Sequence, residues 1–254
     1  MKLVVLGSGT SVPHPRRASA GYWLETQSGT LLLDAGADAP HRMAQEELDW
    51  GNLDAIWISH FHLDHIGGLA PFLFSVRWAP QTRARRKPLK IFGPQGLELL
   101  IKTISNANNY KLLEQSFPVE LIEVESGKEF LILPGLRAST LSTPHTPESM
   151  AIRLTGTNGK SLVYSSDTGF SELLADFARE VELLILECSF RRNKPVEMHL
   201  ELSDAMQLIG DCRPRTALLT HLYPEWDNVN VSGEAQALWP GRTIEAVDGL
   251  RLEV

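Results

Sequence analysis

The segment His60-Phe61-His62-Leu63-Asp64-His65 places three histidines and one aspartate within six positions. It follows residues 55–58, an apolar run typical of a strand, and precedes residues 66–76, whose periodicity predicts a helix. The His-x-His alternation directs both rings to the same side of an extended segment. Imidazole and carboxylate groups together suit zinc, manganese or iron and need no thiolate. A polar surface turn is the alternative interpretation, but this density of ligands favours a metal site.

Three more potential ligands each lie just after an expected strand. They are His145 after residues 136–141, Asp167 after residues 161–164 and His221 after residues 216–219. Any one of them alone would more often be a buried, hydrogen-bonded residue, but three similar placements make coincidence a poor explanation. Two divalent ions in such a site activate a water molecule and stabilise negative charge on a phosphoryl or tetrahedral species. Hydrolysis is therefore the expected chemistry.

A proton donor for the leaving group is also present in the sequence. His199 lies just ahead of an expected helix at residues 203–211, and Glu187 follows the apolar run 183–186. A carboxylate next to an imidazole raises the pKa of the ring and fixes its tautomer, which suits a general acid. The alternative is that His199 only caps the helix and that Glu187 is a solvated strand end.

Two further residues are weaker candidates. Asp34 ends the apolar run 30–33 and could orient a metal-binding histidine, although a turn role is equally compatible. Arg17 could contact a substrate phosphate or could be an exposed, solvated side chain. The Gly-Ser-Gly-Thr segment at residues 7–10 lacks the third glycine of a dinucleotide-binding loop, so that function is rejected.

The elements that must position these side chains alternate along the chain. Expected strands are residues 3–6, 21–25, 30–33, 55–58, 89–92, 119–124, 129–133, 136–141, 151–154, 161–164, 183–186, 216–219 and 243–246. Expected helices are residues 38–48, 66–76, 94–106, 171–180, 203–211 and 232–238. Continuous apolar runs are typical of strands covered on both faces. We therefore expect two sheets covered by helices in a single α/β domain that spans residues 1–254.

Composition excludes several classes of protein. Hydrophobic residues make up 43% of the 254 residues, enough for a packed core, and the net charge of -7 opposes non-specific attraction to nucleic acid or an anionic membrane. Cys188 and Cys212 have no CxxC-type neighbours, so we expect no disulfide framework and a reducing compartment. No apolar stretch reaches the length of a membrane helix or a signal-peptide core, which predicts a cytoplasmic protein with no membrane partner.

The ordered set of motifs resembles the metallo-β-lactamase superfamily, and most closely its ribonuclease Z-like branch. The resemblance runs through nearly the whole chain, over residues 6–10, 32–36, 60–65, 164–168 and 220–221. It implies a four-layer αββα metallo-β-lactamase sandwich, a homodimer, and two divalent metal ions, with Zn²⁺ favoured and Mn²⁺ or iron compatible. It assigns His60, His62 and His145 to one ion, Asp64, His65 and His221 to the other, and Asp167 to both. It also places Asp64, His199 and Glu187 in the catalytic set.

The substrate implied is a phosphodiester, because a poor alkoxide leaving group benefits from a positioned acid. Ribonuclease Z carries a basic arm between the positions that match His145 and Asp167, but only 21 residues separate them here. Of its PxKxRN loop, only Pro13 and Arg17 are present. A small or nucleotide-derived phosphodiester is therefore favoured over pre-tRNA. A carboxyl-ester, thioester or lactone hydrolase and a non-catalytic metal-binding protein remain alternatives.

A basic cluster could still bind a nucleic-acid backbone. It comprises Arg83, Arg85, Arg86, Lys87 and Lys90. A charge run of this kind is usually a solvated loop, and the acidic total charge opposes nucleic-acid binding. Nucleic acid is therefore a possible partner that the sequence does not favour.

Overall fold

The computed structural model describes residues 1–254 and contains two seven-stranded sheets. The first has the spatial order β14-β1-β2-β3-β4-β5-β6. Its strands are β1 (Lys2–Gly7), β2 (Gly21–Thr26), β3 (Gly29–Leu33), β4 (Ala55–Trp57), β5 (Leu89–Gly93), β6 (Val119–Glu123) and β14 (Arg251–Glu253). The second has the order β13-β12-β11-β10-β9-β8-β7. Its strands are β7 (Glu129–Leu133), β8 (Leu136–Ser142), β9 (Met150–Gly156), β10 (Ser161–Tyr164), β11 (Leu183–Glu187), β12 (Thr216–Thr220) and β13 (Arg242–Glu245).

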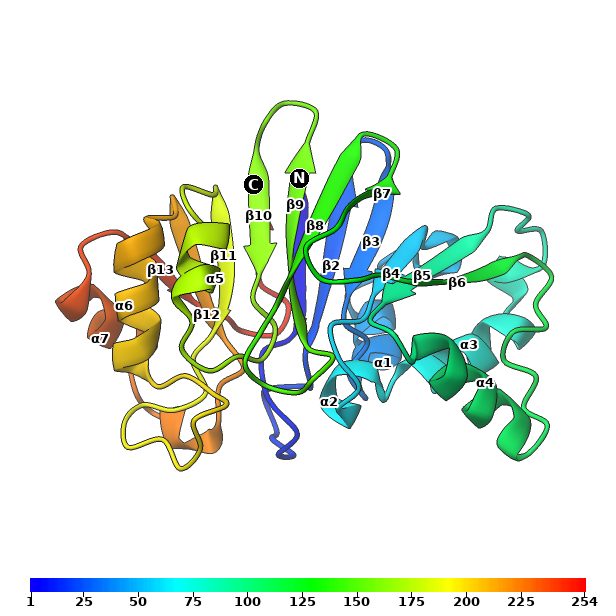
Figure 1. Ribbon diagram of the computed structural model, residues 1–254. Helices are drawn as coiled ribbons and strands as arrows, with labels where there is room; N and C mark the ends of the chain where they lie inside the picture. The colour runs from blue at the N-terminus through cyan, green and yellow to red at the C-terminus, as the bar shows by residue number, and fades with distance from the viewer.

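Helices cover the outer face of each sheet (Figure 1). Beside the first sheet lie α1 (Ala39–Gln45), α2 (Leu63–Ile66), α3 (Leu69–Trp78) and α4 (Leu97–Ala107). Beside the second lie α5 (Glu172–Phe177), α6 (Leu202–Cys212) and α7 (Val231–Leu238). Short 3-10 helices are η1 (Trp50–Asn52), η2 (Pro80–Thr82) and η3 (Pro224–Trp226). The predicted αββα order of layers is confirmed. None of the helices combines the length and hydrophobicity needed to span a lipid bilayer.

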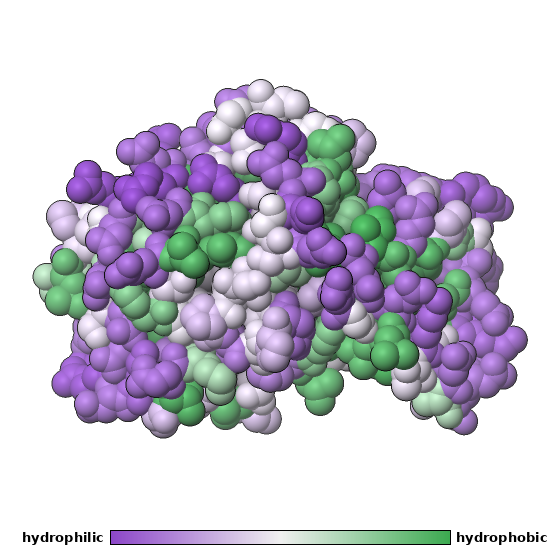
Figure 2. Space-filling view, in the orientation of Figure 1, coloured by the Kyte–Doolittle hydropathy of each residue, from purple (hydrophilic) through white to green (hydrophobic).

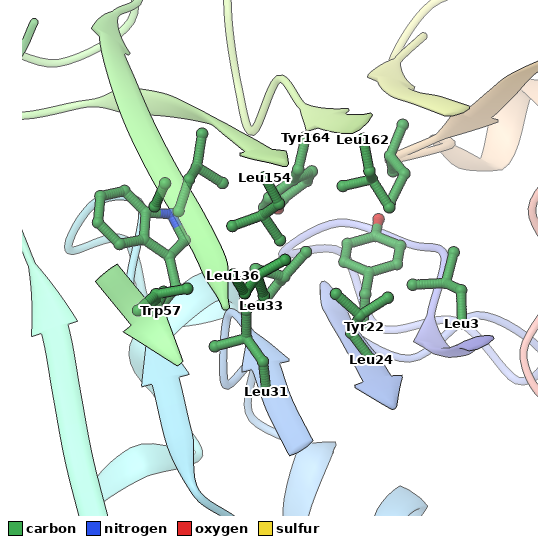
Figure 3. Packing of buried hydrophobic residues seen from close by; sticks show 14 of the residues in the cluster. Leu3, Tyr22, Leu24, Leu31, Leu33, Trp57, Leu136, Leu154, Leu162 and Tyr164 are labelled. Atoms are coloured by element: carbon green, nitrogen blue, oxygen red, sulfur yellow. The ribbon is translucent and has the colours of Figure 1, made fainter. Parts of the chain in front are cut away.

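The apolar strands are buried on both faces, which explains their continuous hydrophobic runs. In β1, Leu3 and Val5 face the second sheet, whereas Val4 and Leu6 face the helices. This alternation follows from the two-residue period of a strand. Figure 3 shows the layer between the sheets, where leucines of both sheets pack around Trp57 and the two tyrosines Tyr22 and Tyr164. On the outside, Figure 2 shows a largely hydrophilic face with hydrophobic residues in separate patches.

The parallel parts of the two sheets create one functional edge. Strands β3 to β6 are parallel neighbours in the first sheet, and β10 to β13 are parallel neighbours in the second. Loops that follow the carboxyl ends of parallel strands are the usual location of a site in open α/β sheets. In Figure 1, α2 follows β4 at the lower edge, whereas both chain termini lie toward the opposite edge.

The helix expected at residues 66–76 is divided in two. The structure has α2 and α3 instead, with Gly67 and Gly68 between them. A Cβ atom on Gly68 would lie 2.2 Å from the carbonyl oxygen of Gly36, so only glycine allows this close approach of the two backbones. The break separates the four-residue helix that carries Asp64 and His65 from the longer helix that covers the sheet.

The basic cluster near residue 85 has a structural role. Arg85 is buried, donates a 2.9 Å hydrogen bond to the carbonyl of Gly51, and places its guanidinium 4.4 Å from the ring centroid of Phe117. Lys87 forms an ion pair with Asp54. Arg85 and Lys87 thus have partners within the fold, whereas Arg83, Arg86 and Lys90 are exposed and form no ion pair.

Replacing Arg85 by alanine is expected to lower the free energy of unfolding by about 2–4 kcal/mol, because several buried carbonyl groups lose a charged donor at once. Urea denaturation followed by circular dichroism measures this change. The control is Arg83→Ala, at an exposed position in the same loop, which should change the free energy by less than about 0.5 kcal/mol. Equal stability of the two variants would contradict the structural role of Arg85.

Candidate metal centre

The connection from β4 to α2 carries four of the predicted ligands. His62 has an extended backbone (φ -64°, ψ 145°) at the start of α2, and Asp64 and His65 lie in the first turn of that helix. His60 and His65 are fully buried, whereas His62 is exposed. The change from extended to helical backbone lets side chains that are adjacent in sequence approach one location from different directions.

The other three predicted ligands come from the second sheet. His145 lies between β8 and β9, Asp167 follows β10, and His221 follows β12. His221 and Ser166, the neighbour of Asp167, have left-handed backbones with φ of 56° and 54°. Non-glycine residues hold this conformation only where the surrounding structure enforces it, and such strain concentrates at functional sites.

These seven side chains form two groups that share Asp167. The groups are His60, His62, His145 and Asp167, and Asp64, His65, His221 and Asp167, with the ligand atoms of each within 4.8 Å of one another. Oδ2 of Asp167 lies 3.8 Å from Nε2 of His60 and 3.5 Å from Nε2 of His145. Its Oδ1 lies 3.1 Å from Nε2 of His65 and 3.3 Å from Nε2 of His221. Each oxygen of Asp167 therefore faces a different group, the division that the family resemblance implies.

The chemistry of these side chains fits divalent cations. Nε2 of His60, Nε2 of His65 and Oδ1 of Asp167 are buried and have no hydrogen-bond partner. Buried polar atoms are nearly always paired, so three unpaired atoms aimed at one location require another partner. Burial lowers the pKa of His60 to about 2, which keeps its ring in the neutral form that binds metals. Burial would raise the pKa of Asp167, but His221 and His65 hold it well below its usual range, so the carboxylate stays charged.

Asp34 orients one of the candidate ligands. Its Oδ2 lies 2.7 Å from Nδ1 of His65 and accepts a 2.7 Å hydrogen bond from the hydroxyl of Tyr164. It also accepts hydrogen bonds from the backbone N–H and the hydroxyl of Ser59. A carboxylate that holds Nδ1–H leaves Nε2 of the histidine free to bind a cation. Of the two interpretations of Asp34, its contacts match the one in which it orients a histidine.

The predicted pair of Glu187 and His199 is present beside the two groups. Nδ1 of His199 lies 2.9 Å from Oε1 of Glu187, and the His199 ring centroid is 4.8 Å from that of His145 and 5.4 Å from that of His221. Burial would lower the pKa of His199, but the hydrogen bond to Glu187 raises it above its ordinary value. A raised pKa favours the protonated ring, the form that can donate a proton.

Ser189 connects this pair to a candidate ligand and was not identified from the sequence. Its hydroxyl donates a 2.5 Å hydrogen bond to Oε2 of Glu187, so its lone pairs remain for Nδ1 of His221, 3.0 Å away. The proton of His221 is therefore on Nδ1, and Nε2 faces the carboxylates. Ser59, which donates two hydrogen bonds to Asp34, is a second residue of the site that was not identified from the sequence. Both serines lie within two positions of a predicted site residue, and this proximity is the only signal of their role in the sequence.

The environment of Arg17 differs from both alternatives that the sequence left open, contact with a substrate phosphate and exposure to solvent. It is 9% exposed, and its Nη1 lies 2.6 Å from Oδ1 of Asp227. Its Nη2 lies 3.9 Å from Oε1 of Glu245. The two carboxylates compensate its charge, so Arg17 is not an exposed, solvated side chain, and its contacts give no support to phosphate binding.

Comparison with known proteins shows the family of this chain. The family model described as "Anti-Pycsar protein Apyc1" matches residues 1–239. An uncharacterized protein of Mycobacterium leprae, ML1173, is 29% identical over 262 residues, which cover 100% of this chain and 89% of that protein.

Two solved structures show the fold. The metallo-β-lactamase fold protein YhfI from Bacillus subtilis has a TM-score of 0.83 at 22% identity and covers 99% of both chains. The short form of human tRNase Z has a TM-score of 0.80 at 20% identity and covers 100% of this chain and 99% of that chain. The curated sequence of YhfI is named as a probable metallo-hydrolase and is 24% identical over 252 residues, 98% of each protein. With the ligand groups described above, these relatives support a metal-dependent hydrolase. The chain thus belongs to the family of the anti-Pycsar protein Apyc1 and has the metallo-β-lactamase fold, close to the ribonuclease Z-like proteins.

Proposed function

We propose that this protein is a metal-dependent phosphodiesterase that acts on a small or nucleotide-derived phosphodiester. The observation that carries the proposal is the position of His199. It is held by Glu187 with its ring beside His145 and His221, one from each group of candidate ligands. A proton donor next to a two-metal site is what cleavage of a phosphodiester with an alkoxide leaving group requires.

The two groups that share Asp167 would hold a pair of divalent ions, for which we propose Zn²⁺, with Mn²⁺ or iron as alternatives. When bound, such ions acidify water and stabilise negative charge on phosphoryl oxygens. The chain itself contributes orientation. Asp34 fixes the tautomer of His65, Ser189 fixes that of His221, and the Glu187 carboxylate fixes that of His199.

The short connection between His145 and Asp167 supports a small substrate. It consists of β9 and β10 joined by a tight turn, in which Gly156 donates a 3.0 Å backbone hydrogen bond to Lys160. There is no inserted arm here of the kind that ribonuclease Z uses to hold tRNA. A single domain over residues 1–254, a homodimer and a cytoplasmic location are part of the same proposal and rest on the sequence and the family resemblance.

Removal of the metal is expected to abolish hydrolysis of an activated aryl phosphodiester, and added Zn²⁺ or Mn²⁺ should restore it. Asp167→Asn should lose most of the bound metal in elemental analysis, because this residue belongs to both groups. Asp211→Asn, at an exposed position of α6, is the control and should keep its metal. Full turnover after chelation would refute the proposal. Hydrolysis of esters, thioesters or lactones without any phosphodiester turnover would favour the acyl hydrolase instead.

His199→Ala is expected to slow cleavage of a phosphodiester with an alkoxide leaving group by about 10²–10⁴-fold. The same variant should lose much less activity on a nitrophenyl phosphodiester, because nitrophenolate leaves without protonation. Steady-state rates on the two substrates give the comparison, and His41→Ala, at an exposed position, serves as the control. An equal loss on both substrates would show that His199 does not act as the acid.

A further inference from the structure

A second polar cavity lies at the edge of the sandwich opposite the candidate metal centre. Its volume is about 360 Å³, and its charged side chains are Lys2, Lys160, Arg215, Arg242, Glu182 and Glu253. Strand β12 begins next to Arg215 and ends next to His221, at the other edge. A five-residue strand spans about 15 Å, so this cavity is separate from the metal centre.

The four cations of this cavity have no ionic partner within the protein. Many other lysines and arginines form ion pairs, but no salt bridge or hydrogen bond of the structure involves the side chains of Lys2, Lys160, Arg215 or Arg242. The protein as a whole has a net charge of -7, whereas the side chains around this cavity include four cations and two carboxylates. The cavity therefore has a local excess of positive charge that attracts anions.

The backbone holds the cations around the cavity. Arg242 pairs with Thr216 across β12 and β13, and Arg215 immediately precedes that threonine. Lys2 comes from the other sheet, so the cavity spans the junction of the two sheets. Of its two acidic side chains, Glu182 is held in place by a 2.7 Å hydrogen bond that its Oε2 accepts from the backbone N–H of Ser161.

We propose that this cavity binds a phosphate group, as inorganic phosphate or as part of a phosphomonoester such as a nucleotide. Arginine and lysine together are the side chains that bind phosphate, through paired and single charged hydrogen bonds. Its volume lies in the range of small-ligand sites, about 300–1,000 Å³. The ligand would add negative charge to a cavity in which cationic side chains outnumber acidic ones.

Isothermal titration calorimetry of the metal-loaded full chain with inorganic phosphate, and separately with adenosine 5′-monophosphate, tests the proposal. The Arg215→Ala/Arg242→Ala variant should bind the anion about tenfold or more weakly at this site, because it loses two charged donors. Binding at the metal centre and phosphodiester turnover should be unchanged in this variant. Arg83→Ala/Arg86→Ala makes the same change in net charge elsewhere and should leave both binding events intact.

Glu253→Gln provides a test that does not depend on the loss of a side-chain contact. Removal of this exposed negative charge should strengthen anion binding several-fold. Tighter binding of the nucleotide than of phosphate would identify a nucleotide as the ligand, and equal affinity would identify the phosphate group alone. Both results support the site. Phosphate binding that is absent outside the metal centre, or that none of the cavity variants alters, would overturn it.

Discussion

A buried carboxylate surrounded by imidazole rings imposes the main constraint on this structure. Asp167 is 2% exposed, and each of its oxygens faces histidines from a different part of the chain. A charge in this position is costly unless other charges or donors satisfy it, and the protein alone leaves its Oδ1 unpaired. Bound cations would offset that cost, and the same cations would give the site its reactivity. Stability of the sandwich edge and chemistry at that edge would therefore depend on the same interaction.

Contacts between the two sheets keep the ligands in register. Asp34 follows β3 of the first sheet, whereas Tyr164 ends β10 of the second, and their 2.7 Å hydrogen bond crosses the sandwich. Tyr22 and Thr220 make a second crossing at 2.7 Å. The first of these hydrogen bonds involves Asp34, which also contacts the candidate ligand His65. The second involves Thr220, the neighbour in sequence of the candidate ligand His221. A shift of one sheet relative to the other would therefore separate the two halves of the metal centre.

The dense ligand segment at residues 60–65 and the apolar runs of the strands are local signals, so the site and most of the fold were predictable from the sequence. Features that depend on distant contacts were not. Residues 251–253 form a strand only because β1 offers them a free edge to pair with. Arg85 and Arg17 read as free charges in the sequence, but each finds its partners far away in the chain. Charge patterns alone do not distinguish an arginine that binds a ligand from one that stabilises a loop.

Ser189 connects the proposed acid, His199, to the candidate metal centre through a directed series of hydrogen bonds. Because its hydroxyl donates to Glu187, it can only accept from His221, and Glu187 in turn holds Nδ1 of His199. Both histidines thus carry a proton on Nδ1, and Nε2 of His221 faces the carboxylates of Asp64 and Asp167. The hydroxyl of Ser189 thus contacts both the candidate ligand His221 and Glu187, the carboxylate that holds His199. The proposed acid His199 and the candidate ligand His221 are therefore coupled through Ser189 and Glu187, so a change of tautomer in one ring would affect the other.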